Sequence, residues 1–478
     1  MEKPIKNDAI TSRDVDFAQW YTDVCKKAEL MDYSSTKGFI IYRPYGYAIW
    51  ERIQAYLNQR FAETGHENVY MPMVIPESLF KKEKEHVEGF APETLIATYG
   101  GKEKLDDPLI IRPTSEVLFC EHYSKIISSY RDLPKKYNQW CSVVRWEKTT
   151  RPFLRGAEFL WQEGHTVHEK EEDARVETLS MLSIYEQLGK DLLAIPFLSG
   201  RKTEKEKFAG AEETYAIEAL MHDGKSLQSG TTHYFGTGFA KAFNIRYQDR
   251  NNTLQYAHQT SWGVSTRLIG SLIMVHGDDN GLVLPPFVAP IQVVLVPIMM
   301  QKEGVLEAAR SLQSELIKLG LRVKLDDSPQ SPGWKFAEYE MKGVPLRIEI
   351  GPRDLAQGQV VIALRDTKEK RMVSLSDVSQ QVPILLKELH QRLLLSAQQH
   401  LNDHIRDAHS LEELINILNT HGGYVRMSVS DELEVETIIK EKAQATARVI
   451  PFHQEGLAPT CAITGKPAKR FVLFARAY

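Results

Sequence analysis

The chain has 478 residues, of which 42% are hydrophobic and 26% charged, and its formal net charge is −4. This composition indicates an ordinary soluble protein of two to four domains, without low-complexity tracts or internal repeats. No apolar run approaches a membrane span, and the polar, acid-containing segment 1–14 is unlike a secretory signal or a transit peptide, so we expect a cytoplasmic protein without membrane contact.

The first predicted elements lie between Pro44 and Val74. Apolar residues at helical spacing predict a helix from Tyr47 to Phe61. The next run, Val69–Val74, predicts a strand, in which Pro72 removes one backbone donor from the ladder. We therefore expect this strand at a sheet edge or at an interface.

The segment Gln139–His165 holds the most informative pattern, two strand-like apolar runs around a charged loop. Arg145 and Glu147 stand two apart, so on a strand both project from one face, where a guanidinium can bind a carboxylate or phosphate. Arg155 follows the loop, and Phe159 offers an aromatic face to a purine. This spacing suits an adenylate. The alternative is an amphipathic hairpin with surface salt bridges.

A third pattern lies downstream, where Ser261–Arg267 (SWGVSTR) leads into the apolar, helix-like run Leu268–His276. Arg267 would stand near the start of this helix. Small residues before a helix let a phosphate or a backbone approach closely, so this segment is also suited to an anion.

Prolines at 285, 286 and 290 then interrupt the chain, as a linker between folded units would. The elements predicted after them alternate in a way typical of a small α/β sheet with helices on its faces. These elements are strand Ile291–Pro297, helix Val305–Leu319, strand Leu321–Asp326, helix Lys335–Lys342, strand Leu346–Ile350 and strand Gln359–Leu364. A third unit begins with helical patterning near Ala397 and ends in Phe471–Tyr478.

The four cysteines, Cys25, Cys120, Cys141 and Cys461, include no Cys-x-x-Cys pair, so they predict neither a disulfide framework nor a metal knuckle. A net negative charge does not exclude nucleic acid if basic residues cluster locally. Candidate clusters are Arg365 with Lys368, Lys370 and Arg371, and the stretch Lys335–Arg353. The alternative is that both are solvated faces.

Together, the helix and strand with Pro72, the Arg145-x-Glu147 hairpin with Arg155 and Phe159, and the segment ending at Arg267 resemble the three signature motifs of class II aminoacyl-tRNA synthetases. Further segments resemble prolyl-tRNA synthetases of the archaeal and eukaryotic type, and the resemblance runs from about Ala18 to Tyr478. They are RPTSE (112–116), VVRWE (143–147), FLWQEGH (159–165), KFAGAEETYAIEALM (207–221), SWGVSTR (261–267), HGDDNGLVLPP (276–286) and GWKFAEYEMKGVPLRIEIGPRD (333–354).

The resemblance implies an α+β protein: a class II antiparallel-sheet catalytic domain (residues 1–284), an α/β anticodon-binding domain (285–396) and a small α+β C-terminal domain (397–478). It also implies a homodimer with Pro72 near the interface. The substrates would be L-proline, tRNA(Pro) and ATP with Mg.

The implied reaction is attack of the proline carboxylate on the α-phosphate of ATP, followed by transfer to the terminal ribose of the tRNA. Neither step needs a side-chain nucleophile, so catalysis rests on positioning and charge stabilisation. By resemblance, the catalytic residues are Arg145 and Arg267. The ATP-binding residues are Arg145, Glu147, Arg155, Gly156, Phe159, Gln228, Thr231, Ser265 and Arg267, with Gln228 also near the nucleotide's Mg.

The proline pocket implied by the resemblance needs two acceptors for a secondary ammonium group and apolar walls for the ring. Thr114 and Glu116 would accept, because they stand two apart on RPTSE. The full set of proline-binding residues is Thr114, Glu116, Arg145, Trp161, Glu163, His165, Phe208, His233, Ser261 and Gly263. Smaller amino acids such as alanine and cysteine are plausible errors, since a missing methylene costs only about 1–3 kcal/mol.

The chain departs from the family pattern in two places. Gly156-Ala157 replaces a usual Thr-Arg pair, which leaves open a synthetase-like protein that does not activate proline. Only Cys461, with Val449 where a cysteine is usual, remains of a C-terminal zinc site, so we expect no zinc. The stretch between His165 and Ser261 is too short for the large editing insertion of typical bacterial relatives, so we expect no cis-editing.

Two further expectations concern the anticodon and the chain end. The residues implied to contact guanines of the anticodon are Lys335, Glu338, Arg347, Arg353 and Asp354. The terminal Tyr478 would reach toward the catalytic domain. The other enzyme reading is a class II synthetase for threonine, glycine or histidine, and a threonine enzyme would need zinc ligands that the cysteine count does not supply.

Overall fold

The computed structural model describes residues 10–86 and 93–478. Its centre is a seven-stranded sheet with the order β3-β7-β8-β14-β11-β10-β9. Neighbouring strands are antiparallel, except that β3 and β7 are parallel. The strands are β3 (Glu67–Asn68), β7 (Lys135–Val144), β8 (Glu158–His168), β9 (Leu198–Arg201), β10 (Glu213–Leu220), β11 (Ser226–Gly236) and β14 (His258–Ser265).

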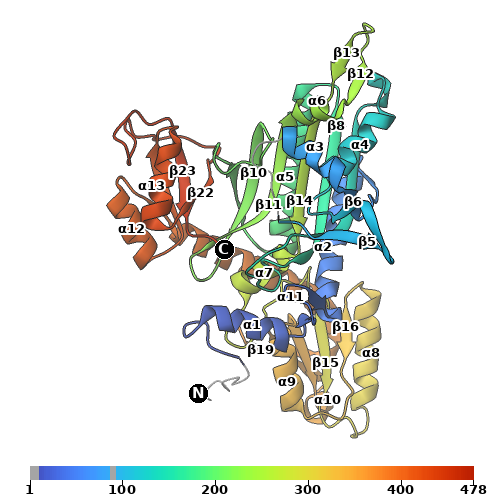
Figure 1. Ribbon diagram of the computed structural model, residues 1–478. Helices are drawn as coiled ribbons and strands as arrows, with labels where there is room; N and C mark the ends of the chain where they lie inside the picture. The colour runs from blue at the N-terminus through green and yellow to red at the C-terminus, as the bar shows by residue number, and fades with distance from the viewer. Residues whose placement is uncertain (1–9, 87–92) are drawn as a thin grey trace.

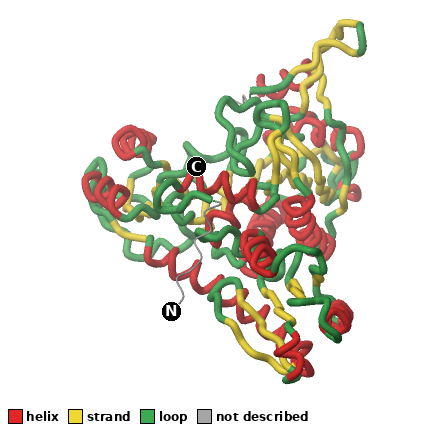
Figure 2. The backbone as a smooth tube through the Cα atoms, turned by 90° about the horizontal axis from the view of Figure 1, so that it is seen from below, coloured by secondary structure: helices red, strands yellow, loops and turns green. Residues whose placement is uncertain are grey.

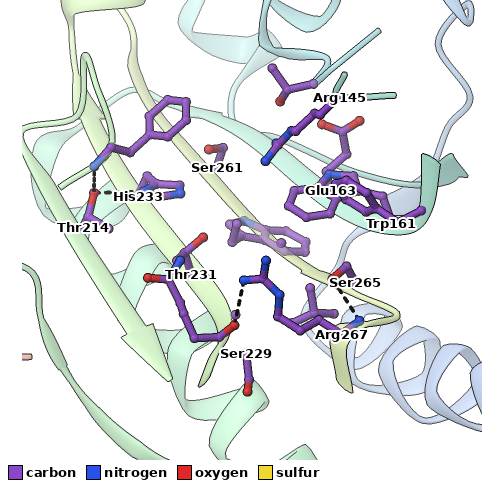
Figure 3. A pocket seen from close by; sticks show the side chains of 18 of the residues that line it. Arg145, Trp161, Glu163, Thr214, Ser229, Thr231, His233, Ser261, Ser265 and Arg267 are labelled. Carbon is purple, nitrogen blue, oxygen red and sulfur yellow. Dashed lines mark hydrogen bonds between the residues drawn. The ribbon is translucent and has the colours of Figure 1, made fainter. Parts of the chain in front are cut away.

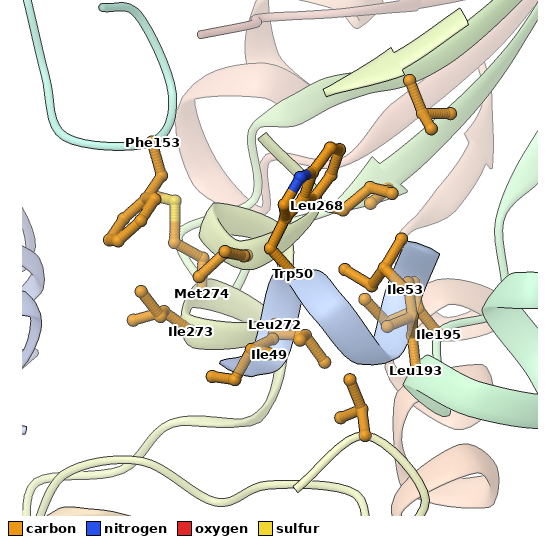
Figure 4. Close-up of a cluster of buried hydrophobic side chains, with 14 of the residues drawn as sticks. Ile49, Trp50, Ile53, Phe153, Leu193, Ile195, Leu268, Leu272, Ile273 and Met274 are labelled. Carbon is orange, nitrogen blue, oxygen red and sulfur yellow. The ribbon is translucent and has the colours of Figure 1, made fainter. Parts of the chain in front are cut away.

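Helices cover this sheet and hold its core. Helix α7 carries almost continuous apolar residues and is buried nearly all round, so it forms a central support on which α1 and α2 pack. Figure 4 shows side chains of α2, such as Trp50 and Ile53, meeting Leu268 and Leu272 of α7. These helices are α1 (Phe17–Lys27), α2 (Pro44–Glu63), α4 (Glu116–Ile126), α5 (Glu171–Leu188), α6 (Gly238–Phe243) and α7 (Arg267–His276).

Three small sheets flank the large one. Strand β6 pairs with both β4 and β5 beside helix α3, while the other two sheets are single hairpins. The elements are β1 (Met31–Tyr33), β2 (Ile40–Tyr42), β4 (Val74–Pro76), α3 (Glu77–His86), β5 (Ile96–Gly100), β6 (Glu103–Ile111), β12 (Arg246–Gln248) and β13 (Leu254–Tyr256).

A five-stranded unit follows, with the order β16-β15-β17-β18-β19. Strands β16, β15 and β17 are parallel, and β18 and β19 continue the sheet antiparallel. Its elements are β15 (Val293–Pro297), α8 (Val305–Lys318), β16 (Val323–Leu325), α9 (Pro332–Met341), β17 (Leu346–Ile350), α10 (Pro352–Ala356), β18 (Gln359–Leu364), β19 (Lys370–Ser374) and α11 (Val378–Asp403).

The last unit is a four-stranded sheet, β20-β21-β23-β22, with two helices. Figure 1 shows this unit (red) beside the β10 end of the large sheet, while the five-stranded unit lies below. Figure 2 shows helices lying beside the strands of the large sheet when the chain is seen from below. The elements are β20 (Ile405–Asp407), α12 (Leu411–Thr420), β21 (Tyr424–Val429), α13 (Leu433–Ala443), β22 (Thr446–Val449) and β23 (Arg470–Ala475).

The predicted α+β architecture is confirmed, because a largely antiparallel sheet is followed by an α/β unit and a small α+β unit. The predicted helices at 268–276 and 305–319 and the strands at 346–350 and 359–364 form within a residue of their expected bounds. The helix predicted from Tyr47 starts earlier, because Pro44 occupies its first turn, where no backbone donor is needed.

The strand predicted at Val69–Val74 is wrong, because residues 69–73 run between β3 and β4 without strand structure and only Val74 belongs to β4. Val69 N and Met73 O still bond to the backbone of Asn138 and Arg112, but at Met71 side chains take the place of a ladder. Gln139 accepts from Met71 N at 2.8 Å, and Arg112 donates to Met71 O at 2.7 Å. A buried backbone needs partners, and here two polar side chains provide them.

Two other geometric expectations fail. Arg145 and Glu147 do not share a strand face, because β7 ends at Val144. Thr114 and Glu116 are not on a strand either, since Glu116 is the first residue of α4. Helix α11 also runs through the position where we predict a domain boundary, between 396 and 397.

Candidate active site

A cavity of about 250 Å³ lies on the large sheet, and all the residues that we predict for catalysis, ATP and proline line it. Figure 3 shows side chains from β8, β11 and β14 converging on this space. Antiparallel pairing explains the convergence, because His233 lies opposite Ser261, and Gly263 opposite Glu163. The pairing therefore joins the separate sequence motifs into one site.

Several lining residues were not predicted from the sequence. These are Phe153, Leu154, Lys202, Glu206, Thr214, Ser229, Gly230, Trp262 and Val264. Thr214 and Lys202 act through partners that are distant in the chain, such as His233 and Glu218. Trp262 and Val264 stand within SWGVSTR, so the motif alone could have included them.

Three arginines give the cavity its electrostatic character. Arg267, at the start of α7, donates from Nε to Leu154 O at 3.0 Å and from a terminal nitrogen to Gln228 O at 3.1 Å. Burial, together with the nearby positive charges of Arg145 and Arg155, lowers the pKa of Arg267 to about 10. Like charges gathered in a buried place favour an anionic ligand, such as a polyphosphate.

Arg145 connects this cationic side to an aromatic wall. Its guanidinium carbon lies 5.5 Å from the ring centres of both Phe159 and Trp161, and its Nε donates to Pro113 O at 3.0 Å. Burial lowers the pKa of Arg145, and the carboxylates of Glu116, Glu163 and Glu147 oppose that effect. Arg145 therefore stands between the acidic and the cationic parts of the cavity.

Glu163 is the centre of a buried hydrogen-bond network. Its carboxylate accepts from Ser115 Oγ at 2.5 Å and from Gln139 Nε2 at 2.7 Å, and it lies 2.9 Å from His165 Nε2. Burial alone would raise the pKa of Glu163, but the hydrogen bond and charge of His165 and the other donors lower it to about 2. Glu163 therefore stays ionised, with its oxygens already engaged by the protein.

The pKa of Glu116 is shifted in the opposite direction to that of Glu163. It accepts a hydrogen bond from Thr114 Oγ1, and burial followed by the neighbouring Glu163 raises its pKa, although the charge of His165 opposes this. A carboxylate that is costly to ionise gains most from a cation placed beside it. Thr114 and Glu116 thus form an acceptor pair by direct contact, not by the shared strand face that we predicted.

An apolar wall closes the side facing β10 and β11. Phe208 and His233 lie with ring centres 4.8 Å apart, and Thr214 Oγ1 lies 2.9 Å from His233 Nδ1 (Figure 3). Burial lowers the pKa of His233 to about 3, so this ring is neutral at physiological pH. A neutral ring can pack against an apolar substrate without repelling its ammonium group.

The loop between β7 and β8 accommodates the Gly156-Ala157 pair. A Cβ on Gly156 would stand 2.5 Å from Glu158 O, which is too close for any larger residue without a backbone shift. Ala157 donates its N–H to Gly38 O at 2.9 Å and accepts from Arg145 N at 2.8 Å. The pair therefore fits a compact loop that holds Arg145 by its backbone.

The predicted anticodon residues are not equivalent in the structure. Lys335 is only 2% exposed and donates to Asp326 O and Ser328 O, both at 2.8 Å, so it holds the loop before α9 and cannot reach a base directly. Glu338 is half-buried and pairs with Lys342 at 2.6 Å. Arg347 stacks over Phe336 and donates to Glu349.

The basic cluster predicted around Arg365 is also wrong. Arg365 is 6% exposed and forms two 2.7 Å hydrogen bonds with Asp278, which joins the five-stranded unit to the catalytic unit. Lys368 pairs with Glu340, and Lys370 with Glu349. These cations are therefore neutralised by acids and do not form a free positive surface.

The chain end packs on the catalytic unit, as the resemblance implied. The hydroxyl of Tyr478 donates to Asp223 at 2.5 Å, and its N–H donates to Ser226 O at 3.1 Å. The guanidinium of Arg151, in the loop that leads to Arg155, lies 5.6 Å from the Tyr478 ring centre. The terminus thus touches the loop that borders the cavity.

Candidate metal ligands are dispersed over residues 10–86 and 93–478. In that part of the chain, no three His, Cys, Asp or Glu residues stand together in a way that could hold a metal ion. Over the same residues, no helix is long and apolar enough to cross a membrane.

Comparison with known proteins identifies three matching families. Residues 99–276 match the tRNA synthetase class II core domain (G, H, P, S and T), residues 292–383 match an anticodon binding domain, and residues 411–478 match the C-terminal domain of prolyl-tRNA synthetase. The chain is 60% identical to a proline–tRNA ligase of Ruminiclostridium cellulolyticum and to one of Lachnoclostridium phytofermentans, and 58% identical to proline–tRNA ligase 2 of Bacillus cereus. Each match covers 98% of both chains.

Proposed function

Because the chain belongs to the prolyl-tRNA synthetase family, we propose that it ligates L-proline to tRNA(Pro), by forming prolyl-adenylate from ATP and then transferring the prolyl group. The observation that carries this proposal is the joining of two unlike charge environments in one cavity. Arg145, Arg155 and Arg267 offer a place for phosphates, and Thr114 with Glu116 offers acceptors for an ammonium group.

The first step places the proline carboxylate against the α-phosphate of ATP. Arg145 stands between the two charge environments, so it can hold the carboxylate and the α-phosphate together. As pyrophosphate leaves, negative charge moves outward, where Arg155 and Arg267 stabilise it. Glu147 and Phe159 bind adenine, by an amino-group hydrogen bond and by stacking, and Arg267 covers the other face of the ring.

The nucleotide enters as its Mg complex, in which the metal neutralises phosphate charge and is held mainly by phosphates and waters. Gln228 and Thr231 on β11 line this part of the cavity, and Ser265 accepts from Arg267 N at 3.1 Å. Neutral oxygens and amides suit a hydrated Mg, so the lining fits the group.

Proline binds on the acidic side. Its secondary ammonium offers two protons, which match the Thr114 and Glu116 oxygens, and its ring packs against Trp161, Phe208 and neutral His233. Glu163 and His165 hold this pocket from behind. A carboxylate whose pKa is raised by burial is restored to its ionised form by the substrate's charge.

The tRNA binds across the other two units. Of the predicted anticodon contacts, Glu338, Arg347, Arg353 and Asp354 remain candidates, and the buried Lys335 holds the loop before α9. We divide the chain at 284 and 396, because the matched families fall on either side of both points, although α11 connects the second and third domains without a break.

The proposal also includes the type of prolyl-tRNA synthetase, its oligomeric state and its cellular compartment. The domain order supports the archaeal and eukaryotic type, since no separate domain interrupts residues 166–260, and with it an enzyme without cis-editing. The three relatives are bacterial proteins whose names give no type. We also propose a cytoplasmic homodimer without bound zinc.

The test is ATP–pyrophosphate exchange with each of the twenty amino acids supplied separately, because exchange isolates adenylation from tRNA. The expected result is exchange led by proline, with weak alanine or cysteine. Preference for another amino acid would contradict the assignment of proline as the substrate. No exchange would favour a synthetase-like protein without activity and would direct attention to Gly156-Ala157.

A further inference from the structure

The segment Lys202–Phe208 follows β9 and forms one side of the cavity. Lys202, Glu206 and Phe208 all line it. Lys202 N donates to Thr214 O at 2.7 Å, and Phe208 N donates to Thr214 Oγ1 at 3.0 Å. Because Thr214 Oγ1 also bonds His233, the position of this segment determines the wall against which the proline ring packs.

The C-terminal unit holds this segment by two side-chain contacts with α13. Thr203 Oγ1 donates to Glu436 at 3.0 Å, and Lys205 Nζ donates to Thr437 Oγ1 at 2.8 Å. Glu436 and Thr437 are neighbours in the chain and lie more than 230 residues beyond the segment, so these contacts exist only when the two units are docked.

Backbone hydrogen bonds also join the catalytic sheet to the C-terminal unit, and we call this contact region the junction. Arg201, the last residue of β9, exchanges two hydrogen bonds with Ile450, at 3.0 and 2.7 Å. Gly200 lies so close to Ile450 that a Cβ at this position would stand 2.5 Å from its carbonyl oxygen. The edge strand of the catalytic sheet is therefore in contact with the C-terminal unit immediately before the cavity-lining segment begins.

A buried ion cluster completes the connection. Lys202 Nζ lies 2.8 Å from Glu218, and Arg448 of β22 donates to both oxygens of the same carboxylate at 3.0 and 2.9 Å. Ser226 Oγ donates to it as well, at 2.7 Å. Glu218 is fully buried, so its charge is stable only while both cations remain in place.

We propose that the C-terminal unit sets the affinity for proline, with Arg448 as a positioning residue that acts through Glu218 and Lys202. Glu436 and Thr437 fix the rest of the segment. Loosening this junction lets Phe208 and His233 move away from the ring site, whereas the arginines that hold the nucleotide lie on other elements. This inference rests on the proposed function.

The experiment uses the full chain and pyrophosphate exchange with varied proline and varied ATP. Two variants loosen the junction, Arg448→Met and the double variant Thr203→Val/Lys205→Met. Arg426→Ala is the matched control, because it removes an arginine of the same unit that pairs with Asp407 on the surface. The expected result is a rise of about 3- to 30-fold in KM for proline in both junction variants, with KM for ATP and kcat changed less than about twofold.

A second readout does not depend on activity. Hydrogen–deuterium exchange of residues 202–212 should increase in both junction variants and stay unchanged in the Arg426→Ala control, and Arg448→Lys should restore part of the protection. Equal losses for proline and ATP, or unchanged exchange of the segment in the folded double variant, would overturn the inference. If the unaltered chain activates no amino acid, the proposed function fails, and the exchange measurement still decides whether the C-terminal unit holds the segment.

Discussion

The active-site cavity and the outer surface of the five-stranded unit are both rich in charge, but their charges are satisfied differently. In the cavity, Arg145, Arg155 and Arg267 lie close enough that their mutual repulsion contributes to the lowered pKa of Arg267. On the five-stranded unit, Arg347 and Lys370 share Glu349.

This difference separates a binding site from a structural surface. Cations that remain together without an acid for each one store electrostatic energy that an anionic ligand releases. Cations that are each paired with a carboxylate are already satisfied, and an exposed pair contributes little to affinity or stability. The predictions below test whether the two regions behave in these two ways.

The largest effect is expected for Arg145→Ala. This change removes the guanidinium between the carboxylate and the α-phosphate, so kcat for pyrophosphate exchange should fall by about 10²- to 10³-fold. Arg131→Ala, an exposed arginine that lies over Tyr130 in the same unit, is the control and should keep full activity. An Arg145→Ala enzyme with normal kcat would mean that the cavity arginines are structural.

The cavity residues that the sequence predicts are those that stand in short motifs. Arg145, Glu163 and His233 stand in short segments with fixed spacing, and strand pairing needed only to bring those segments together. Thr214 was missed although it lies in the quoted segment 207–221, and Lys202 lies outside every quoted segment, because the contacts of these side chains with His233 and Glu218 arise only in the folded sheet.

In the five-stranded unit, elements of secondary structure were easier to predict than the environment of single side chains. Its strands Leu346–Ile350 and Gln359–Leu364 were predicted to the residue, because apolar runs specify them, whereas helix α9 begins three residues before its predicted start and α10 and β19 were not predicted. The burial of Lys335 was not predicted, because a lysine on an amphipathic helix is usually exposed. Here a loop covers the side chain, and Lys335 donates hydrogen bonds to carbonyl groups of that loop. Likewise, no pattern in Val69–Val74 shows that Gln139 and Arg112 replace the ladder there.

The second prediction concerns the acidic side of the cavity. Glu116→Gln keeps the shape of the side chain and removes its charge, so the loss of one charge-assisted hydrogen bond should raise KM for proline about 10- to 100-fold. KM for ATP should change little. Glu121→Gln, on the exposed face of the same helix, removes only a surface pair with Lys125 and is the control.

The pH dependence of proline binding sharpens that test. Burial and the neighbouring Glu163 raise the pKa of Glu116, and the ionised carboxylate binds the ammonium group more strongly than the neutral acid, because it adds charge attraction to the hydrogen bond. Bound proline therefore favours loss of the proton, so KM for proline should rise as pH falls toward this raised pKa, by up to about tenfold per pH unit below it. The Glu116→Gln enzyme should lack this rise, whereas an identical profile in both enzymes would assign the titration to another group.

The smallest effects are expected on the five-stranded unit, where Lys335 and Glu338 stand about one turn apart on α9 and should have different roles. Lys335→Met leaves the carbonyls of Asp326 and Ser328 without their donor, so it should lower the free energy of unfolding by about 1–3 kcal/mol and leave KM for tRNA unchanged in the folded fraction. Glu338→Ala removes a half-exposed carboxylate, so it should raise KM for tRNA several-fold and leave proline adenylation intact. Thermal melting and aminoacylation of both variants decide the assignment. If Lys335→Met instead raised KM for tRNA without loss of stability, the satisfied cations of this unit would bind RNA after all, and the contrast with the cavity would fail.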